Sequence, residues 1–271
     1  MIDGLRRLDL PGIAILIVLV FLVLLPVATV FLWAFAEQWF YPALLPTRWG
    51  FKYWDQLLAR ADVWSAFSTS VRLASIVTGL SAVICLPAAY AFARLPIPFK
   101  QAFFMSILLA NAFPRFALIV SIAILLLKNG LIGTWAGVIV VQLLNTVLLM
   151  VWLPTAAFRS VSVSMEEAAQ DLGASPLQVF WYITLPQALP TIAAAMLMTF
   201  VWTFYETEGA WLVGAPRVQT VPILMMQMIR NALVVQNGAV LTVLLWVPSL
   251  FALLLARRVL GSESFARGLG G

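Results

Sequence analysis

The segment Pro11–Ala36 contains no charged residue and is long enough to cross a membrane as one helix, since about 20 helical residues span the hydrocarbon core. It is too long for a simple signal peptide and lacks a small-residue cleavage site. In the whole chain 63% of residues are hydrophobic and 10% are charged, whereas soluble surfaces carry about 25% charged residues. We therefore expect lipid, not water, around most of this chain.

Five further apolar runs follow, separated by shorter polar connections. We expect membrane-spanning helices near Ser65–Ala93, Gln101–Leu127, 134–158, Gln187–Trp211 and Val234–Ala256. Together with the first run they make six spans. The sequence thus predicts an all-α integral membrane protein in which residues 1–271 form a single transmembrane domain.

Basic residues indicate how the six spans are oriented. Half of the sixteen Lys and Arg residues fall in short flanks on one side of the predicted bundle: Arg6, Arg7, Arg94, Lys100, Arg159, Arg257, Arg258 and Arg267. Such residues concentrate on the cytoplasmic side of a membrane. We therefore expect both termini and the connection 159–186 to lie in the cytoplasm.

Several classes of function are excluded by residue content. The chain has no His and a single Cys, Cys85, so an internal disulfide, a His-based metal site and Ser-His-Asp catalysis are impossible. A lone Cys among apolar neighbours typically packs as a small hydrophobic residue. The net charge of +5 lies mainly beside the spans, which indicates membrane topology. We expect neither a metal site nor a nucleic-acid partner.

The connection 159–186 has the pattern of two short helices joined by a turn. Residues 164–167 read Ser-Met-Glu-Glu, the Ser-x-x-Glu pattern of a capping box, which predicts a helix beginning at Ser164. Gly173 can end that helix in a left-handed conformation. Ser175-Pro176 is typical of a second helix start, and Leu185-Pro186 is expected to end that second helix.

Ala168 and Ala169 give the first of these helices a face of small side chains, which permits close approach by another protein. The apolar second helix would anchor it to the transmembrane bundle. Cytoplasmic loops also contain amphipathic helices without a partner. The residues alone therefore leave both a docking role and a purely structural role open.

Within this connection the residues Glu167-Ala168-Ala169, Gly173, Ile183 and Leu185-Pro186 stand at the spacing of the EAA signature of ABC importer permeases. The six-span layout resembles that of type I importers along nearly the whole chain. The resemblance implies that the connection is a coupling helix that docks on a cytoplasmic ABC ATPase dimer. Glu167 and Gly173 would set its shape, Ala168 and Ala169 would form its contact face, and Leu185-Pro186 would lock it to the fifth span.

The same resemblance implies the other components of a transporter in a bacterial inner membrane. A solute-binding protein outside the membrane would deliver a small polar solute, and a second permease, or a second copy of this chain, would complete the pathway. ATP and Mg would bind to the ATPase, because this chain has no GxxxxGK[ST] phosphate loop. We therefore expect a non-catalytic subunit that binds no cofactor itself.

Ionisable groups inside spans are candidates for a solute pathway, because burying them in hydrocarbon is costly. Arg115 directly follows Pro114, which can break the third span, and Asn111 lies four residues earlier on the same helical face. Arg115 either contacts the solute, or it snorkels to the interface or pairs with a carboxylate.

Four further polar residues are candidates for this pathway. Gln142 and Asn145, three residues apart in the fourth span, suit hydrogen bonds between helices. Glu206 and Glu208 lie near the outer end of the fifth span beside aromatic residues. They either receive a cationic solute, or pair with Arg115 or Arg217, or remain ordinary solvated loop charges.

The importer subgroup is indicated by longer stretches. YETEGAWLVGAPRVQTVPI (205–223) and the proline in the third span resemble permeases for polyamines, iron, thiamine or phosphonates. AYAFAR (89–94) and NGLIGTWAGVI (129–139) resemble sugar permeases. Arg115 departs from the polyamine pattern, which tends to have an acidic residue after this proline, and an arginine would repel a polycation. The substrate alternatives are a polyamine-like or other small organic ion, including a phosphonate, and then a sugar.

One other class of function remains as an alternative, and a further class lacks support in the sequence. An ion-coupled secondary transporter would work without an ATPase, but such proteins usually place ionisable residues deep in several spans and often contain internal repeats. An intramembrane enzyme would need a catalytic group of residues that this sequence does not contain.

Overall fold

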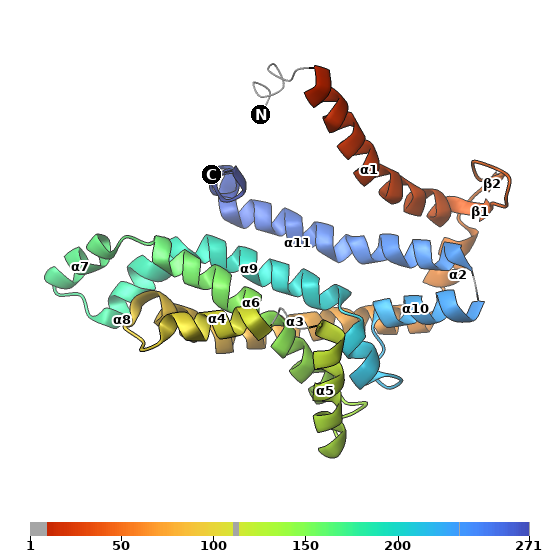
Figure 1. Ribbon diagram of the computed structural model, residues 1–271. Coiled ribbons are helices and arrows are strands. Elements are labelled where there is room, and N and C mark those ends of the chain that lie inside the picture. Colours follow the sequence, from red (N-terminus) through yellow and green to blue (C-terminus); the bar gives the residue numbers. More distant parts are fainter. Residues whose placement is uncertain (1–9, 111–113, 233, 271) are drawn as a thin grey trace. The chain divides into compact units, whose positions relative to one another are not determined.

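The computed structural model describes residues 10–110, 114–232 and 234–270, and this part of the chain is almost entirely helical (Figure 1). Five helices are long and apolar enough to cross a membrane. They are α1 (Leu10–Phe35), α3 (Ala61–Arg94), α6 (Trp135–Ser160), α9 (Leu185–Tyr205), which continues a helical run from Pro176, and α11 (Val235–Gly270).

Shorter elements lie between these helices. They are β1 (Ala36–Gln38), β2 (Arg48–Trp49), α2 (Lys52–Leu58), α4 (Lys100–Ala110), α5 (Arg115–Lys128), α7 (Val163–Asp171), α8 (Pro176–Val179), the π-helical turns η2 (Phe180–Thr184) and η3 (Ala210–Gly214), and α10 (Val221–Ala232).

The chain divides into two compact units. One comprises Met1–Val63 and Met225–Trp246, and the other comprises Trp64–Leu224 and Val247–Gly271. Every described candidate site residue belongs to the second unit. The prediction of one domain over residues 1–271 stays a prediction.

The first unit contains a small antiparallel sheet that the all-α prediction did not include. Strands β1 and β2 pair directly after α1, and Arg48 forms an ion pair with Glu37 across the sheet, with 2.8 Å between Nε and Oε2. A side chain at Gly50 would overlap the Glu37 carboxylate, so it would displace that carboxylate from its position beside Arg48. This hairpin depends on pairing between segments whose individual strands are too short to give a period-two pattern.

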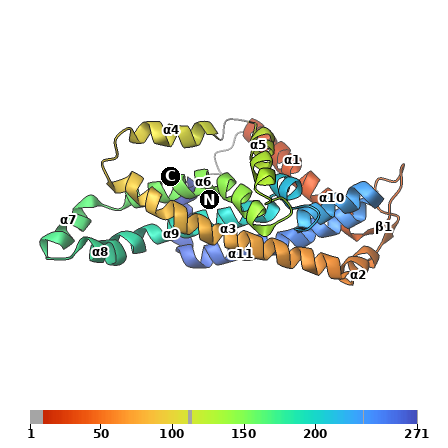
Figure 2. The same ribbon diagram turned by 90° about the horizontal axis from the view of Figure 1, so that it is seen from below.

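The expected third span is divided into two shorter helices. α4 ends at Ala110, α5 begins at Arg115, and Pro114 immediately precedes α5, in agreement with the predicted break at this proline. Proline lacks the backbone N–H that would continue a helix. Figures 1 and 2 show α4 and α5 running in different directions. The described residues thus form five long apolar helices, and the expected third span is present as the two shorter helices α4 and α5.

Helices α3, α6 and α9 pack closely at the end that carries α7 and α8, as both views show (Figures 1 and 2). The contact is built from small residues, with Ala89, Ala157 and Ala188 all buried in one cluster beside Phe158 and Ile192. Small side chains let helix backbones approach closely, which is how helices associate when lipid removes the hydrophobic driving force. The connection 159–186 is therefore attached to a tightly packed base.

The middle of the same bundle contains Cys85, which is buried against Met150, Val151 and Ala195. This confirms the interpretation of Cys85 as a small apolar side chain. At the opposite end, a third cluster that includes Ile119, Val138 and Val213 joins α5, α6 and η3. The two ends of the bundle are the two regions in which candidate functional residues gather.

Candidate functional site

Helix α7 begins two residues earlier in the connection than the capping pattern predicts. Its N-cap is Ser162 and its first residue is Val163, so Ser164 lies inside the helix and the predicted start at Ser164 is wrong. The Ser162 and Ser164 hydroxyl groups hydrogen-bond to each other at 2.7 Å, and no side-chain cap is formed. The Ser164 hydroxyl, which was expected to cap the helix, bonds to Ser162 instead.

Gly173 ends α7 in the predicted left-handed conformation, with φ of +92°. The Ala174 N–H donates to the Ala169 carbonyl at 3.0 Å and the Gly173 N–H donates to the Gln170 carbonyl at 2.8 Å, the pattern of a Schellman C-cap. No atom lies within 4 Å of where a Cβ would stand on Gly173. Backbone conformation, not space, is what requires glycine here.

The second helix of the connection begins as predicted. Ser175 is its N-cap, Pro176 is its first residue, and Ser175 and Gln178 form a reciprocal capping box. The prediction that Leu185-Pro186 ends this helix is wrong, because α8, η2 and α9 form one continuous helical run. The Leu185 N–H reaches the Phe180 carbonyl in a π-helical turn, and this wider turn precedes Pro186, which has no N–H to donate.

The residues of the EAA pattern form an open surface around this turn. Glu167 and Ala168 are exposed and Ala169 is half-buried, while Leu172 has 91% of its surface exposed. A shallow pocket of about 420 Å³ opens between the two helices. Its lining residues are Ala169, Leu172, Gly173, Ala174, Gln178, Val179, Tyr182 and Ile183. The small-residue face that the sequence predicts is thus accessible to a second protein.

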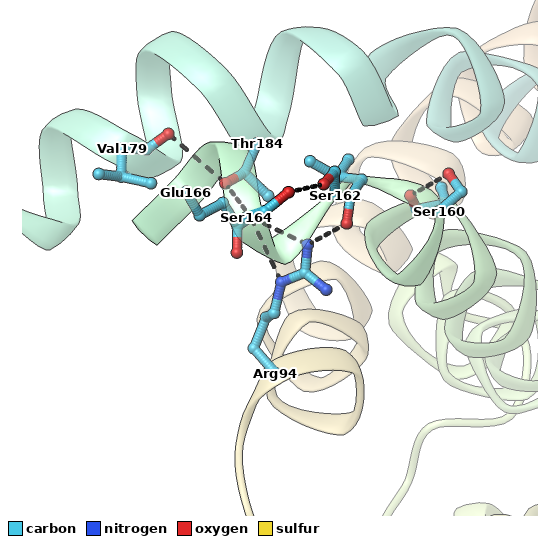
Figure 3. A network of polar contacts seen from close by, with 9 residues as sticks. Arg94, Ser160, Ser162, Ser164, Glu166, Val179 and Thr184 are labelled. Carbon is cyan, nitrogen blue, oxygen red and sulfur yellow. Dashed lines mark hydrogen bonds and ion pairs between the residues drawn. The ribbon is translucent and has the colours of Figure 1, made fainter. Parts of the chain in front are cut away.

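Glu166 is a site residue that sequence reasoning did not single out. Its side chain points inward, where its Oε1 atom lies 2.9 Å from Nη2 of Arg94 and accepts a 2.6 Å hydrogen bond from the Thr184 hydroxyl (Figure 3). Arg94 Nη2 also donates to the Val161 carbonyl at 2.9 Å. The sequence feature that could have indicated this pair is Arg94, a basic residue at the end of an apolar span, on the same side as the connection 159–186.

At the opposite end of α6 and α9 the structure brings Gln142 and Glu206 together. Gln142 Nε2 donates to Glu206 Oε2 at 3.3 Å, and the backbone N–H groups of Gly209 and Ala210 donate to the same carboxylate at 2.7 and 3.0 Å. Both side chains are buried. The interhelical hydrogen bond expected for Gln142 is present, and Glu206 is not a solvated loop charge.

The other candidates near this end are less fully bonded. Arg115 lies over the ring of Trp202, 5.0 Å from its centroid, and its Nη2 is buried without a hydrogen-bond partner. Asn145 Nδ2 is also buried and unpaired, whereas Glu208 is exposed. Among the described residues Arg115 forms no ion pair with a carboxylate. Asn111 lies outside the described residues.

Residues 82–261 match the family described as binding-protein-dependent transport system inner membrane component. The chain belongs to this family. It is therefore a multi-pass inner membrane protein of the ABC transporter permease class, a membrane component that is not itself an enzyme.

Relatives in this family carry different solutes. The chain is 30% identical over 148 residues, 54% of each protein, to a trehalose transport system permease protein of Mycobacterium tuberculosis. It is 35% identical over 91 residues, 34% of this chain and 32% of the relative, to a putrescine transport system permease protein of Escherichia coli. The chain thus matches about half or less of the length of these relatives. They do not resolve the subgroup.

A solved structure shows the shared fold over nearly the whole chain. The crystal structure of a bacterial ABC transporter involved in the import of the acidic polysaccharide alginate aligns with a TM-score of 0.72 and 18% identity. The alignment covers 95% of this chain and 96% of that one. At this identity the likeness concerns the fold alone.

Proposed function

We propose that this protein is the permease subunit of a binding-protein-dependent ABC importer and moves a small polar solute by alternating access. The observation that carries the proposal is the connection 159–186. Its exposed face and Gly173 turn lie at one end of the bundle, in a chain that belongs to a transport family. On this proposal the connection faces the cytoplasm and both termini lie on that side of a bacterial inner membrane.

The arrangement supports a coupling role for the connection. Glu167, Ala168 and Ala169 would contact a cytoplasmic ABC ATPase dimer, which binds ATP and Mg while this chain binds no cofactor. The continuous helical run from α8 through η2 into α9 would transmit movement of the connection directly to the span. Leu185 and Pro186 stand where this run enters α9. Closure of the ATPase dimer would then tilt α9 and change access to the pathway.

We further propose that the chain crosses the membrane six times. Five long helices would be complete crossings, and α4 and α5 would together make the third crossing with a break at Pro114. Irregular backbone is tolerated at membrane depth only where protein or a water-filled cavity surrounds it. The break therefore marks a position facing the pathway, which a second permease or a second copy of this chain would close.

Arg115 and Asn145 support a solute that carries hydrogen-bond acceptors. Each has a buried N–H group without a partner, and a buried donor without an acceptor is costly. A sugar hydroxyl, carboxylate or phosphonate oxygen would satisfy these donors, whereas a polyamine would meet a positive charge at Arg115. We propose an oxygen-rich polar solute, delivered by an extracytoplasmic binding protein, in preference to a polycation.

The proposal is tested by purifying the tagged protein from its native membranes in mild detergent and returning the purified assembly to lipid vesicles. We expect recovery of an ATPase with a phosphate-binding loop, together with a second permease or a second copy, and uptake that requires ATP and the loaded binding protein. Uptake by the chain alone, driven by an ion gradient without ATP, would instead establish a secondary transporter.

A further inference from the structure

Helix α7 packs on the rest of the protein through a buried carboxylate, that of Glu166, and not through an apolar face. Glu166 is the one buried residue among those of α7, with 8% of its surface exposed. Glu167 and Ala168 are exposed, and Ala169 is half-buried beside the open pocket. The position of α7 over the bundle therefore depends on what Glu166 contacts.

Those contacts come from two other segments of the chain. Arg94, the last residue of α3, places Nη2 2.9 Å and Nε 3.3 Å from Glu166 Oε1. Thr184, the last residue of η2, is fully buried and donates to the same oxygen at 2.6 Å. Arg94 also donates to the carbonyl of Val161, directly after α6. Figure 3 shows Arg94 and Thr184 converging on the Glu166 carboxylate.

We propose that Arg94, Glu166 and Thr184 form a latch through which α7 moves α3 as well as α9. The inference rests on the proposed function of the connection 159–186. The π-helical turn η2 already joins the connection covalently to α9. The latch adds a second route, in which force on α7 reaches α3 through Arg94. Arg94, Glu166 and Thr184 are thus positioning residues that decide which spans follow the coupling helix.

A charged latch suits this task better than an apolar contact. Hydrogen bonds to charged groups are short and directional, so they determine orientation as well as proximity. Apolar contacts between helices can slide. With one partner removed, the remaining buried charge is left uncompensated, so the latch is either fully formed or strongly unfavourable. That property makes α7 and the end of α3 move together.

The test uses the complete transporter in lipid vesicles, with ATPase, partner permease and binding protein. The variants are Glu166→Gln, Arg94→Lys and Thr184→Val, with Thr184→Ser as the conservative replacement that keeps the hydroxyl. Asp171→Asn is the matched control, because it removes one negative charge from the same helix at an exposed position. Three quantities are measured for each: recovery of the ATPase with the permease, ATP hydrolysis without solute, and solute moved per ATP hydrolysed.

We expect the first three variants to retain the ATPase and to hydrolyse ATP without solute, while solute moved per ATP falls at least about fivefold, the lower range of typical coupling between sites. Thr184→Ser and Asp171→Asn should keep wild-type coupling. The exchanged pair Arg94→Glu with Glu166→Arg should recover part of the loss, which a merely structural defect would not do.

The same experiment separates the two levels of inference. Wild-type coupling in Glu166→Gln and Arg94→Lys, in a wild-type transporter that itself couples ATP to uptake, would overturn the latch and leave the importer intact. A wild-type protein that neither retains an ATPase nor uses ATP would overturn the proposed function. Spin labels on α7 and α3 that separate on ATP binding in the wild type would also contradict the latch.

Discussion

Glu166 and Glu167 are neighbours in the chain but serve opposite sides of α7. The Glu166 carboxylate is buried against Arg94 and Thr184, while Glu167 is exposed. Successive residues on a helix are about 100° apart, so two adjacent acidic residues can lie on the buried and on the exposed side of one helix. One holds the helix to the bundle and the other is left for a partner.

This division predicts that a substitution of the exposed Glu167 affects ATPase binding but not stability. We expect Glu167→Lys to leave the protein inserted in the membrane with unchanged thermal stability, because an exposed side chain contributes little to folding. Recovery of the ATPase in a pull-down should fall. Asp55→Lys provides a control with the same change of charge at an exposed position of α2, outside the connection. Equal ATPase recovery from Glu167→Lys and wild type would remove Glu167 from the proposed contact face.

Gly173 is expected to be sensitive to backbone conformation and not to side-chain size. Gly173→Ala and Gly173→Val should both destabilise the turn by about 1–2 kcal/mol, because a residue with a Cβ is strained at φ of +92°. Gly173→Asn should cost less, since Asn tolerates the left-handed region. Protease cleavage within the connection is a suitable measurement. A cost that rises steeply from Gly173→Ala to Gly173→Leu, which is unbranched at Cβ, would indicate crowding that the structure does not contain.

Gly209 is expected to be sensitive to space. A Cβ there would lie 2.6 Å from Val141 Cγ1 and 3.2 Å from Glu206 Oε1, so Gly209→Ala should lower thermal stability by about 1–3 kcal/mol. Gly79 in α3 has no atom within 4 Å of its Cβ position and provides the matched control. Gly79→Ala should be neutral or stabilising. Similar melting temperatures for both variants in detergent would contradict the packing around Glu206.

The bond between Gln142 and Glu206 predicts a structural role for this pair. Gln142→Leu should destabilise the protein by about 1–3 kcal/mol, because it removes one donor from a buried carboxylate. Gln142→Glu should be worse, since two carboxylates would then face each other. Thermal unfolding measured by Trp fluorescence tests both. A loss of uptake with unchanged unfolding would instead assign Gln142 to the solute pathway.

Arg115 is expected to affect uptake without affecting assembly. Arg115→Gln removes the charge above Trp202, so the concentration of solute needed for half-maximal uptake should rise while ATPase recovery stays unchanged. Arg115→Lys should keep the positive charge but lose the planar group that stacks on the ring. Lys128→Gln at the other end of α5 is the control. Unchanged uptake in Arg115→Gln would return Arg115 to a purely structural role.

Local patterns predicted much of the connection correctly. The Gly173 turn and the Ser175-Pro176 start depend on neighbours within a few residues, and both were readable from the sequence. The start at Ser164 failed because Ser162 and Ser164 bond to each other. The stop at Leu185-Pro186 failed because the chain absorbs the proline next to a π-helical turn, which propensity rules do not anticipate.

The sequence by itself determined that this is a helical membrane protein and that a turn at Gly173 divides the connection 159–186 into two helices. The length of the apolar runs, the placement of charged residues and the turn-forming residues are all local properties of the chain. Its EAA spacing also identified the family to which the chain belongs. Only the tertiary structure decided that Glu166 meets Arg94, 72 residues away, and that Gln142 meets Glu206. Buried polar groups must find partners wherever the packing of helices brings them, and no local pattern specifies that partner.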